Sequence, residues 1–314
     1  MNKRVLFALL LCSLVLLSSC APEDAMSSNY VNLKAVDEKT YVAFSQINPE
    51  LTAKQQTANL YFRYGSQNVL VAEPRQIEVR SGETAELAIL KELLRGPKTS
   101  SGLLFSLMPS GAEVINVVSL QDNRILAITF SEAFVQKGAK VADEAAERIR
   151  RELLLHSICL SITDNSPYLG IQIFIKPDDA GASTYRLDNT FMLQSSNLPM
   201  IPTVRSDTYV SNPQNIAKLL LGAWSRKDLD TMQHFLSAAP NLNELSALVE
   251  SRNNIITYDL DSGSLYDNGT KATLAATLEP INSDEYMVFP LRLVNEDGIW
   301  KVDYDNFVTL LDFI

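Results

Sequence analysis

Side chains that commonly carry chemistry are scarce in this sequence. Its two histidines are His156 and His234, and His156 lies three residues before Cys159, which is half of a metal-binding pattern without a second half. Motifs of serine hydrolases, zinc proteases, nucleotide-binding loops and paired cysteines do not occur. Two aspartate pairs alternate on expected strands, where they could bind a cation or be solvated edge charge: Asp259 with Asp261, and Asp303 with Asp305. We therefore expect a protein that is not an enzyme and has no cofactor or metal.

One cysteine near the N-terminus has a more specific setting. Lys3 and Arg4 precede an uncharged, strongly apolar stretch at 5–17, which suits a secretory signal and is too short to span a bilayer. The stretch ends in Leu-Ser-Ser-Cys at 17–20, which resembles the bacterial lipobox, although an ordinary signal peptide followed by a chance cysteine is the alternative. We expect residues 1–19 to be removed as a signal peptide and Cys20 to carry lipid chains such as palmitate.

Composition limits the partners of the mature chain. The 314 residues carry 27 Lys and Arg against 37 Asp and Glu, a formal charge of −10. Removal of Lys3 and Arg4 with the signal leaves 25 against 37, or −12. An acidic chain without a Lys/Arg cluster is a poor candidate for binding nucleic acid. Once Cys12 is cleaved off and Cys20 is lipidated, Cys159 remains alone in an apolar setting, so we expect a buried structural thiol and no disulfide.

Hydrophobic periodicity predicts an α+β arrangement for the first part of the chain. Residues 85–95 and 139–156 have helical spacing, and Gly96-Pro97 ends the first of these helices. Two β-type runs flank Gln121-Asp122-Asn123 and suggest a hairpin. The expected order is helix, strand, strand, helix, strand. The strands are expected at 59–64, 69–72, 75–80, 113–120, 124–130 and 169–175.

Several short motifs follow one another in this part of the chain. A Leu-Leu-Arg-Gly-Pro helix end at 93–97 precedes a Met-Pro-Ser-Gly turn at 108–111 and an Ile-Thr-Phe-Ser-Glu-Ala-Phe strand end at 128–134. In this order they resemble the GerM domain, a family named for sporulation and spore germination, over about residues 57–178. Met108 and Ala112 replace the isoleucine and threonine common in the family. The element order also resembles ring-building folds, which implies assembly surfaces and no catalytic motif.

The longest expected helix offers a possible interaction surface. Its polar face carries Lys140, Glu144, Glu147 and Arg151, and the Glu144–Arg148 and Glu147–Arg151 pairs have the i,i+4 order that stabilises helices. A polar helix face is usually solvated, so both interpretations remain open. Changing the charges on this face is the test that the sequence suggests.

The remainder of the chain predicts a second domain. The stretch 178–212 has little pattern, and we place the domain junction near 199–207. Helices are expected from Asn212-Pro213 onward, then strands with a hairpin at Glu296-Asp297-Gly298. The Gly-Ile-Trp-Lys-Val run at 298–302 is similar to the NTF2-like family, whose curved sheet wraps helices into a cone. Its possible pocket residues are Tyr286, Phe289 and Trp300.

The expected organisation is a signal peptide at 1–19, a tether at 20–40, a GerM-type domain at 41–198 and an NTF2-like domain at 199–314. The resemblances imply a membrane-anchored lipoprotein on the extracytoplasmic face of the cell membrane. It would act as a noncatalytic interaction or assembly module in sporulation, germination or cell-envelope assembly, with an envelope protein or a second copy as partner. The alternative is a lipoprotein that binds a small molecule or a cell-wall glycan in the C-terminal pocket.

Overall fold

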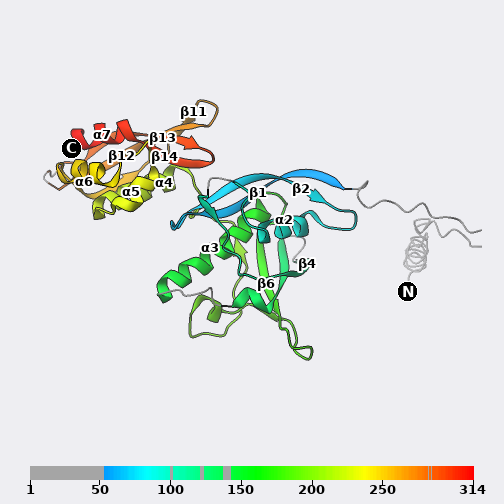
Figure 1. Ribbon diagram of the computed structural model, residues 1–314. Coiled ribbons are helices and arrows are strands. Elements are labelled where there is room, and N and C mark those ends of the chain that lie inside the picture. The colour runs from blue at the N-terminus through cyan, green and yellow to red at the C-terminus, as the bar shows by residue number, and fades with distance from the viewer. Residues whose placement is uncertain (1–52, 100–101, 121–123, 137–142, 282, 284) are drawn as a thin grey trace, which may run out of the picture. The chain divides into compact units, whose positions relative to one another are not determined.

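The computed structural model describes residues 53–99, 102–120, 124–136, 143–281, 283 and 285–314. The expected signal peptide, Cys20, the tether and Lys140 lie outside these residues. The chain is a mixed α+β protein in which helices alternate with three separate sheets (Figure 1).

A long hairpin begins the described chain. Strand β1 (Lys54–Tyr64) pairs antiparallel with β2 (Leu70–Val79), and β3 (Leu104–Phe105) pairs with the end of β1. Helix α2 (Ala85–Leu94) follows, and its first turn is capped by the side chain of Thr84, which accepts a hydrogen bond from the backbone N–H of Leu87. The helix expected at 85–95 is thus confirmed.

A second sheet contains the strands that follow α2. Its order is β4 (Val114–Leu120), β5 (Ile125–Ser131), β6 (Gly170–Lys176) and β7 (Tyr185–Arg186), and β8 (Thr203–Val204) also pairs with β6. The β4–β5 pair is antiparallel, as the hairpin prediction requires, whereas β5 and β6 are parallel. Two short 3-10 helices, η2 (Glu132–Val135) and η3 (Asn189–Met192), accompany this sheet.

Helix α3 (Glu144–Thr163) connects the parallel strands β5 and β6. It begins after Asp143, whose side chain accepts from the N–H of Ala145, and it runs seven residues beyond the expected end at His156. Most of the extension is buried, and α3 packs on β1 and β6. The helix–strand–strand–helix–strand order expected from the sequence is confirmed by α2, β4, β5, α3 and β6.

These elements share one apolar cluster. Leu60 of β1, Ile89 of α2, Phe130 of β5, Ile158 of α3 and Ile173 of β6 all belong to it and are almost fully buried. The burial of aliphatic and aromatic side chains from both sheets and both helices is the main stabilising term here.

The stretch at 178–212, which has little sequence pattern, contains β7, η3 and β8. Strand β8 lies so close to the start of β6 that a Cβ at Gly170 would come within 2.5 Å of the Thr203 carbonyl oxygen. Only glycine fits at this contact. The pairing is therefore set by a close backbone approach that hydrophobic periodicity does not report.

The C-terminal elements form a third sheet with helices. The helices are α4 (Pro213–Arg226), α5 (Leu229–Phe235), α6 (Leu242–Glu250) and α7 (Tyr304–Phe313). The strand order is β10 (Ile255–Leu260), β12 (Lys271–Pro280), β13 (Met287–Glu296), β14 (Ile299–Asp303) and β9 (Leu236–Ser237), and β11 (Ser264–Tyr266) pairs with β12.

Local signals place two of these elements well. Asn212 caps α4 and Pro213 occupies its first turn, as expected. The β13–β14 hairpin turns at Asp297 and Gly298, whose φ angles of 54° and 86° explain the Asp-Gly sequence. Helix α7 was not predicted from the sequence; the side chain of Asp303 caps it by accepting from the N–H of Asn306.

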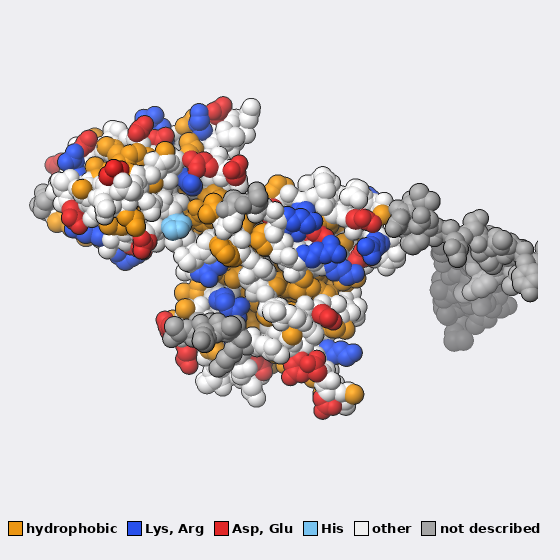
Figure 2. Space-filling view, in the orientation of Figure 1, with side chains coloured by type: hydrophobic (Ala, Val, Ile, Leu, Met, Phe, Trp, Pro, Cys, Tyr) orange, Lys and Arg blue, Asp and Glu red, His pale blue; other side chains and the backbone are white. Residues whose placement is uncertain are grey.

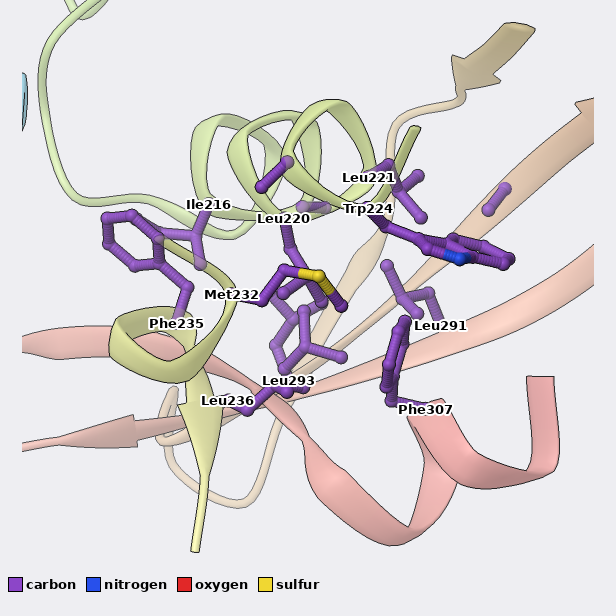
Figure 3. Packing of buried hydrophobic residues seen from close by; sticks show 14 of the residues in the cluster. Ile216, Leu220, Leu221, Trp224, Met232, Phe235, Leu236, Leu291, Leu293 and Phe307 are labelled. Carbon is purple, nitrogen blue, oxygen red and sulfur yellow. The ribbon is translucent and has the colours of Figure 1, made fainter. Parts of the chain in front are cut away.

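The interior of the C-terminal elements is filled by large side chains (Figure 3). Trp224 of α4 meets Phe307 of α7 edge to face, with 5.5 Å between the ring centroids. Both side chains are fully buried, as are Leu220, Met232 and Leu291. The same cluster includes Tyr64, Val69 and Val71 from the turn end of the β1–β2 hairpin.

Candidate functional site

The polar face expected on α3 divides into exposed and buried residues. Glu144 is exposed, whereas Glu147 and Arg151 each have 4% of their surface exposed. Glu147 accepts from Arg150 Nε at 2.8 Å and from Arg151 Nε at 2.6 Å. The expected Glu147–Arg151 pair is confirmed, but it is internal, so these two residues are not available on a solvated helix face. Lys140 lies outside the described residues.

The buried pair joins α3 to η3. Arg151 donates to the Phe191 carbonyl oxygen, and its guanidinium lies 4.9 Å from the centroid of the Phe191 ring. Hydrogen bonds from Arg150 lower the pKa of Glu147 to about 2, although burial opposes the shift, and Arg151 adds to the lowering. Glu147 is thus ionised at neutral pH and supplies the counter-charge that Arg151 needs in a buried position.

The residues proposed for a C-terminal pocket do not share one environment. Phe289 and Trp300 are 6% and 7% exposed within the apolar cluster, and Phe289 packs against the ring of Phe313 at 5.5 Å between centroids. Tyr286, in contrast, is 67% exposed. Phe289 and Trp300 therefore serve as packing residues, because a pocket wall would leave part of their surface open.

The side chains of the two histidines and of Cys159 pack against neighbouring residues. Cys159 is buried and its Sγ donates to the Thr203 carbonyl oxygen at 3.4 Å; burial raises the pKa of this thiol to about 12. The His156 ring packs on Tyr209 at 5.3 Å between centroids, and burial lowers its pKa. The rings of His234 and Tyr64 pack in a T-shaped arrangement, with 6.1 Å between their centroids. Within the described ranges, no three His, Cys, Asp or Glu side chains gather as a metal site would require.

The aspartate pairs are explained by local hydrogen bonds. Asp303 caps α7, and Asp259 accepts from the N–H of Leu260 at 2.9 Å. Asp261 and Asp305 are exposed. Two of the four aspartates thus accept backbone hydrogen bonds nearby, and the other two face the solvent.

The residues of β4 form an apolar surface that sequence analysis did not single out. Strand β4 is at one end of its sheet and has no second strand neighbour among the described residues. Val114 and Val117 pack against the core, whereas Ile115, Val118 and Leu120 are 44%, 48% and 37% exposed. We call these three residues the β4 surface.

Two features of β4 bear on its use. The strand Val-Ile-Asn-Val-Val-Ser-Leu contains no charged residue, although charged side chains are the usual protection of an edge strand. A bulge between Val114 and Asn116 interrupts its register with β5, so regular pairing covers 116–120. An uncharged apolar edge of this kind is suited to pairing with another strand. The alternating pattern of β4 could have suggested this surface, but its edge position depends on the sheet order.

Comparison with known proteins identifies part of the chain. Residues 59–176 match the family described as "Germane: Sporulation and spore germination". This GerM-type region contains β1 to β6 with α2 and α3, and therefore includes both β4 and the Glu147–Arg151 pair. The match confirms the expected GerM resemblance for this region, which is less than half of the chain.

The remaining comparisons add little. A 2.5 Å crystal structure of a "Putative Lipoprotein from Clostridium perfringens" aligns at 16% identity with a TM-score of 0.24, covering 45% of this chain and 93% of that chain. A likeness at this level does not define a fold. No curated protein matches the sequence significantly.

Proposed function

We propose that the protein is a membrane-anchored envelope lipoprotein whose GerM-type region is a noncatalytic assembly module in sporulation, germination or cell-envelope assembly. The match of residues 59–176 to the sporulation and germination family carries this proposal. The use of Cys159, His156 and His234 in packing supports a role without turnover, because each is held by neighbouring protein atoms.

The anchor is the lipid on Cys20, and the location is the extracytoplasmic face of the cell membrane. The Leu-Ser-Ser-Cys sequence after a charged and apolar leader supports this. Among the described residues, no helix has the length and apolar character needed to cross a bilayer.

The domain arrangement of the proposal is a GerM-type domain at 41–198 and an NTF2-like domain at 199–314. Helices α4 to α6 together with a largely antiparallel sheet support the second assignment. The alternative function, ligand binding in a C-terminal pocket, gains no support from Phe289 and Trp300, because both are buried in the apolar cluster.

The partner of the β4 surface is a second copy of this chain. If two β4 strands pair antiparallel about a two-fold axis at Val118, the two Val118 side chains lie opposite each other on one face. Because β4 carries no charged side chain, pairing with its own copy brings no like charges together within the strand.

Sedimentation equilibrium of the mature chain in detergent tests this assembly. The wild type should dimerise, and Val118→Lys should be monomeric because it places two ammonium groups opposite each other. Val288→Lys is the matched control, since Val288 is 61% exposed on β13, which lies between two strands of another sheet. A monomeric wild type, or equal dimerisation of all three proteins, would overturn the role of β4.

A further inference from the structure

A charged groove lies between α2 and the β1–β2 hairpin. Its volume is about 500 Å³, and Ala88 is the one apolar residue among those that line it. Figure 2 shows Lys and Arg side chains gathered over β2 and α2. Four Lys and Arg residues line the groove, namely Arg80, Lys91, Arg95 and Lys98. They are up to 18 residues apart in the sequence, which is why no basic cluster is visible there.

The carboxylates at the base of the groove are already hydrogen-bonded. Glu92 accepts from Arg75, Arg95 and Lys98, with 3.1 Å to Arg75 Nη1 and to Lys98 Nζ. Glu73, which does not line the groove, shares Arg75 with Glu92 and also accepts from the backbone N–H groups of Lys98 and Thr99 at 3.0 Å. Burial raises the pKa values of Glu73 and Glu92, but these hydrogen bonds outweigh it and keep both values low. Both carboxylates are therefore ionised, and their oxygen atoms already accept hydrogen bonds.

The cations at the rim retain free donors. The side chains of Arg95 and Lys98 are 64% and 61% exposed, and each uses one N–H group on Glu92. Lys91 bonds Glu83 at 2.6 Å, and Arg80 reaches Glu78 only at 4.0 Å. A guanidinium has five N–H donors and an ammonium three, so most donors at the rim face the solvent.

We propose that this groove binds the phosphate groups of an extended phosphodiester polymer. Four cations against Glu78, Glu83 and Glu92 leave a local charge of +1 in a chain whose formal charge is −10. Glu83 and Glu92 are hydrogen-bonded to Lys91 and Lys98, and Glu78 is the one exposed carboxylate among the three. The exposed N–H donors therefore outnumber the exposed acceptors at the rim, and phosphate oxygens accept from Arg and Lys well. Helix α2 extends over about 15 Å, so several successive phosphates can contact the rim. This site is separate from the β4 surface and extends the proposed function from assembly to ligand binding.

Fluorescence anisotropy with labelled poly(glycerol phosphate) tests the site, using the lipidated mature chain in neutral detergent. The wild type should bind, and Arg95→Gln with Lys98→Gln should weaken binding at least tenfold. The salt dependence should also fall, because each lost phosphate contact lowers the slope of log K against log salt by about 0.7, or about 1.4 for two. Glu92 keeps Arg75 in this variant, so the fold should be retained in circular dichroism.

The controls separate the groove from general charge effects. Lys176→Gln with Lys218→Gln removes two exposed cations elsewhere and should leave binding unchanged. If the first variant unfolds, Arg80→Gln with Lys91→Gln gives the same test at the other end of the groove. Equal weakening by the control pair would overturn the proposal. It would also be overturned by equal affinity for polyglutamate, or by binding to phosphatidylglycerol micelles alone.

Discussion

Glu147→Gln gives a quantitative test of how the GerM-type region is held together. The substitution keeps the size of the side chain and one acceptor oxygen, but it removes the charge that Arg150 and Arg151 share. Arg151 then stays in a position where its side chain is 5% exposed, without a counter-ion. We therefore expect the substitution to lower the free energy of unfolding by more than the loss of an exposed ion pair would.

The size of the loss follows from the pKa of Glu147. Its fall from 4.5 to about 2, at about 1.4 kcal/mol per pH unit, corresponds to about 3.5 kcal/mol. Arg150, the larger cause of the shift, has a side chain that is 18% exposed, so water screens part of this interaction and leaves about 2 kcal/mol. Leaving a buried arginine unpaired acts in the same direction, so we expect a loss of about 2 to 4 kcal/mol at pH 7.

The effect should depend on pH with a definite sign. A carboxyl whose pKa is lowered on folding stabilises the protein above its unfolded value of 4.5, and this stabilisation is lost as pH falls toward about 2. Urea unfolding followed by circular dichroism should therefore separate wild type and Glu147→Gln at pH 7 and bring them together as pH falls below about 2. Glu144→Gln, an exposed carboxyl in the same helical turn, is the control and should change stability by less than about 0.5 kcal/mol. Equal effects of the two variants at pH 7 would refute the buried pair.

Two further predictions concern anchoring and chemistry. Cys20→Ala should release the protein from membranes or leave it unprocessed, which fractionation checks; radiolabelled lipid remaining on this variant would contradict the anchor. Size-matched replacement of Cys159, His156 and His234 together should leave function intact when circular dichroism reports a stable fold; loss of function in a stable triple variant would count against a noncatalytic role.

Local signals in the sequence were sufficient for several elements. Asp297-Gly298 marks its hairpin because few other residues adopt positive φ angles, and Asn212-Pro213 marks the start of α4 because it combines a cap with a compatible first turn. The GerM motifs were identified because their order along the chain restricts chance matches more than any single motif does.

The features that could not be predicted depend on contacts between residues far apart in the chain. Glu147 and Arg151 are spaced like a solvated helical pair, and their burial depends on Phe191, 40 residues later in the chain. Tyr64 and Val71 likewise join a cluster made mostly of residues beyond 215. The exposure of Val118 depends on the position of β4 at the end of the sheet, which follows from the parallel pairing of β5 with β6.

Oxidative cross-linking at Val118 tests the central claim most directly. Because the proposed two-fold axis places the two Val118 side chains opposite each other, Val118→Cys should give a disulfide-linked dimer of the mature lipidated chain under mild oxidation. Cys159 is buried and should not compete. Val288→Cys, on an exposed position of β13, should give no disulfide-linked dimer, because this position lies outside the proposed interface. Absence of the Val118→Cys dimer, or equal cross-linking of both variants, would contradict assembly through β4.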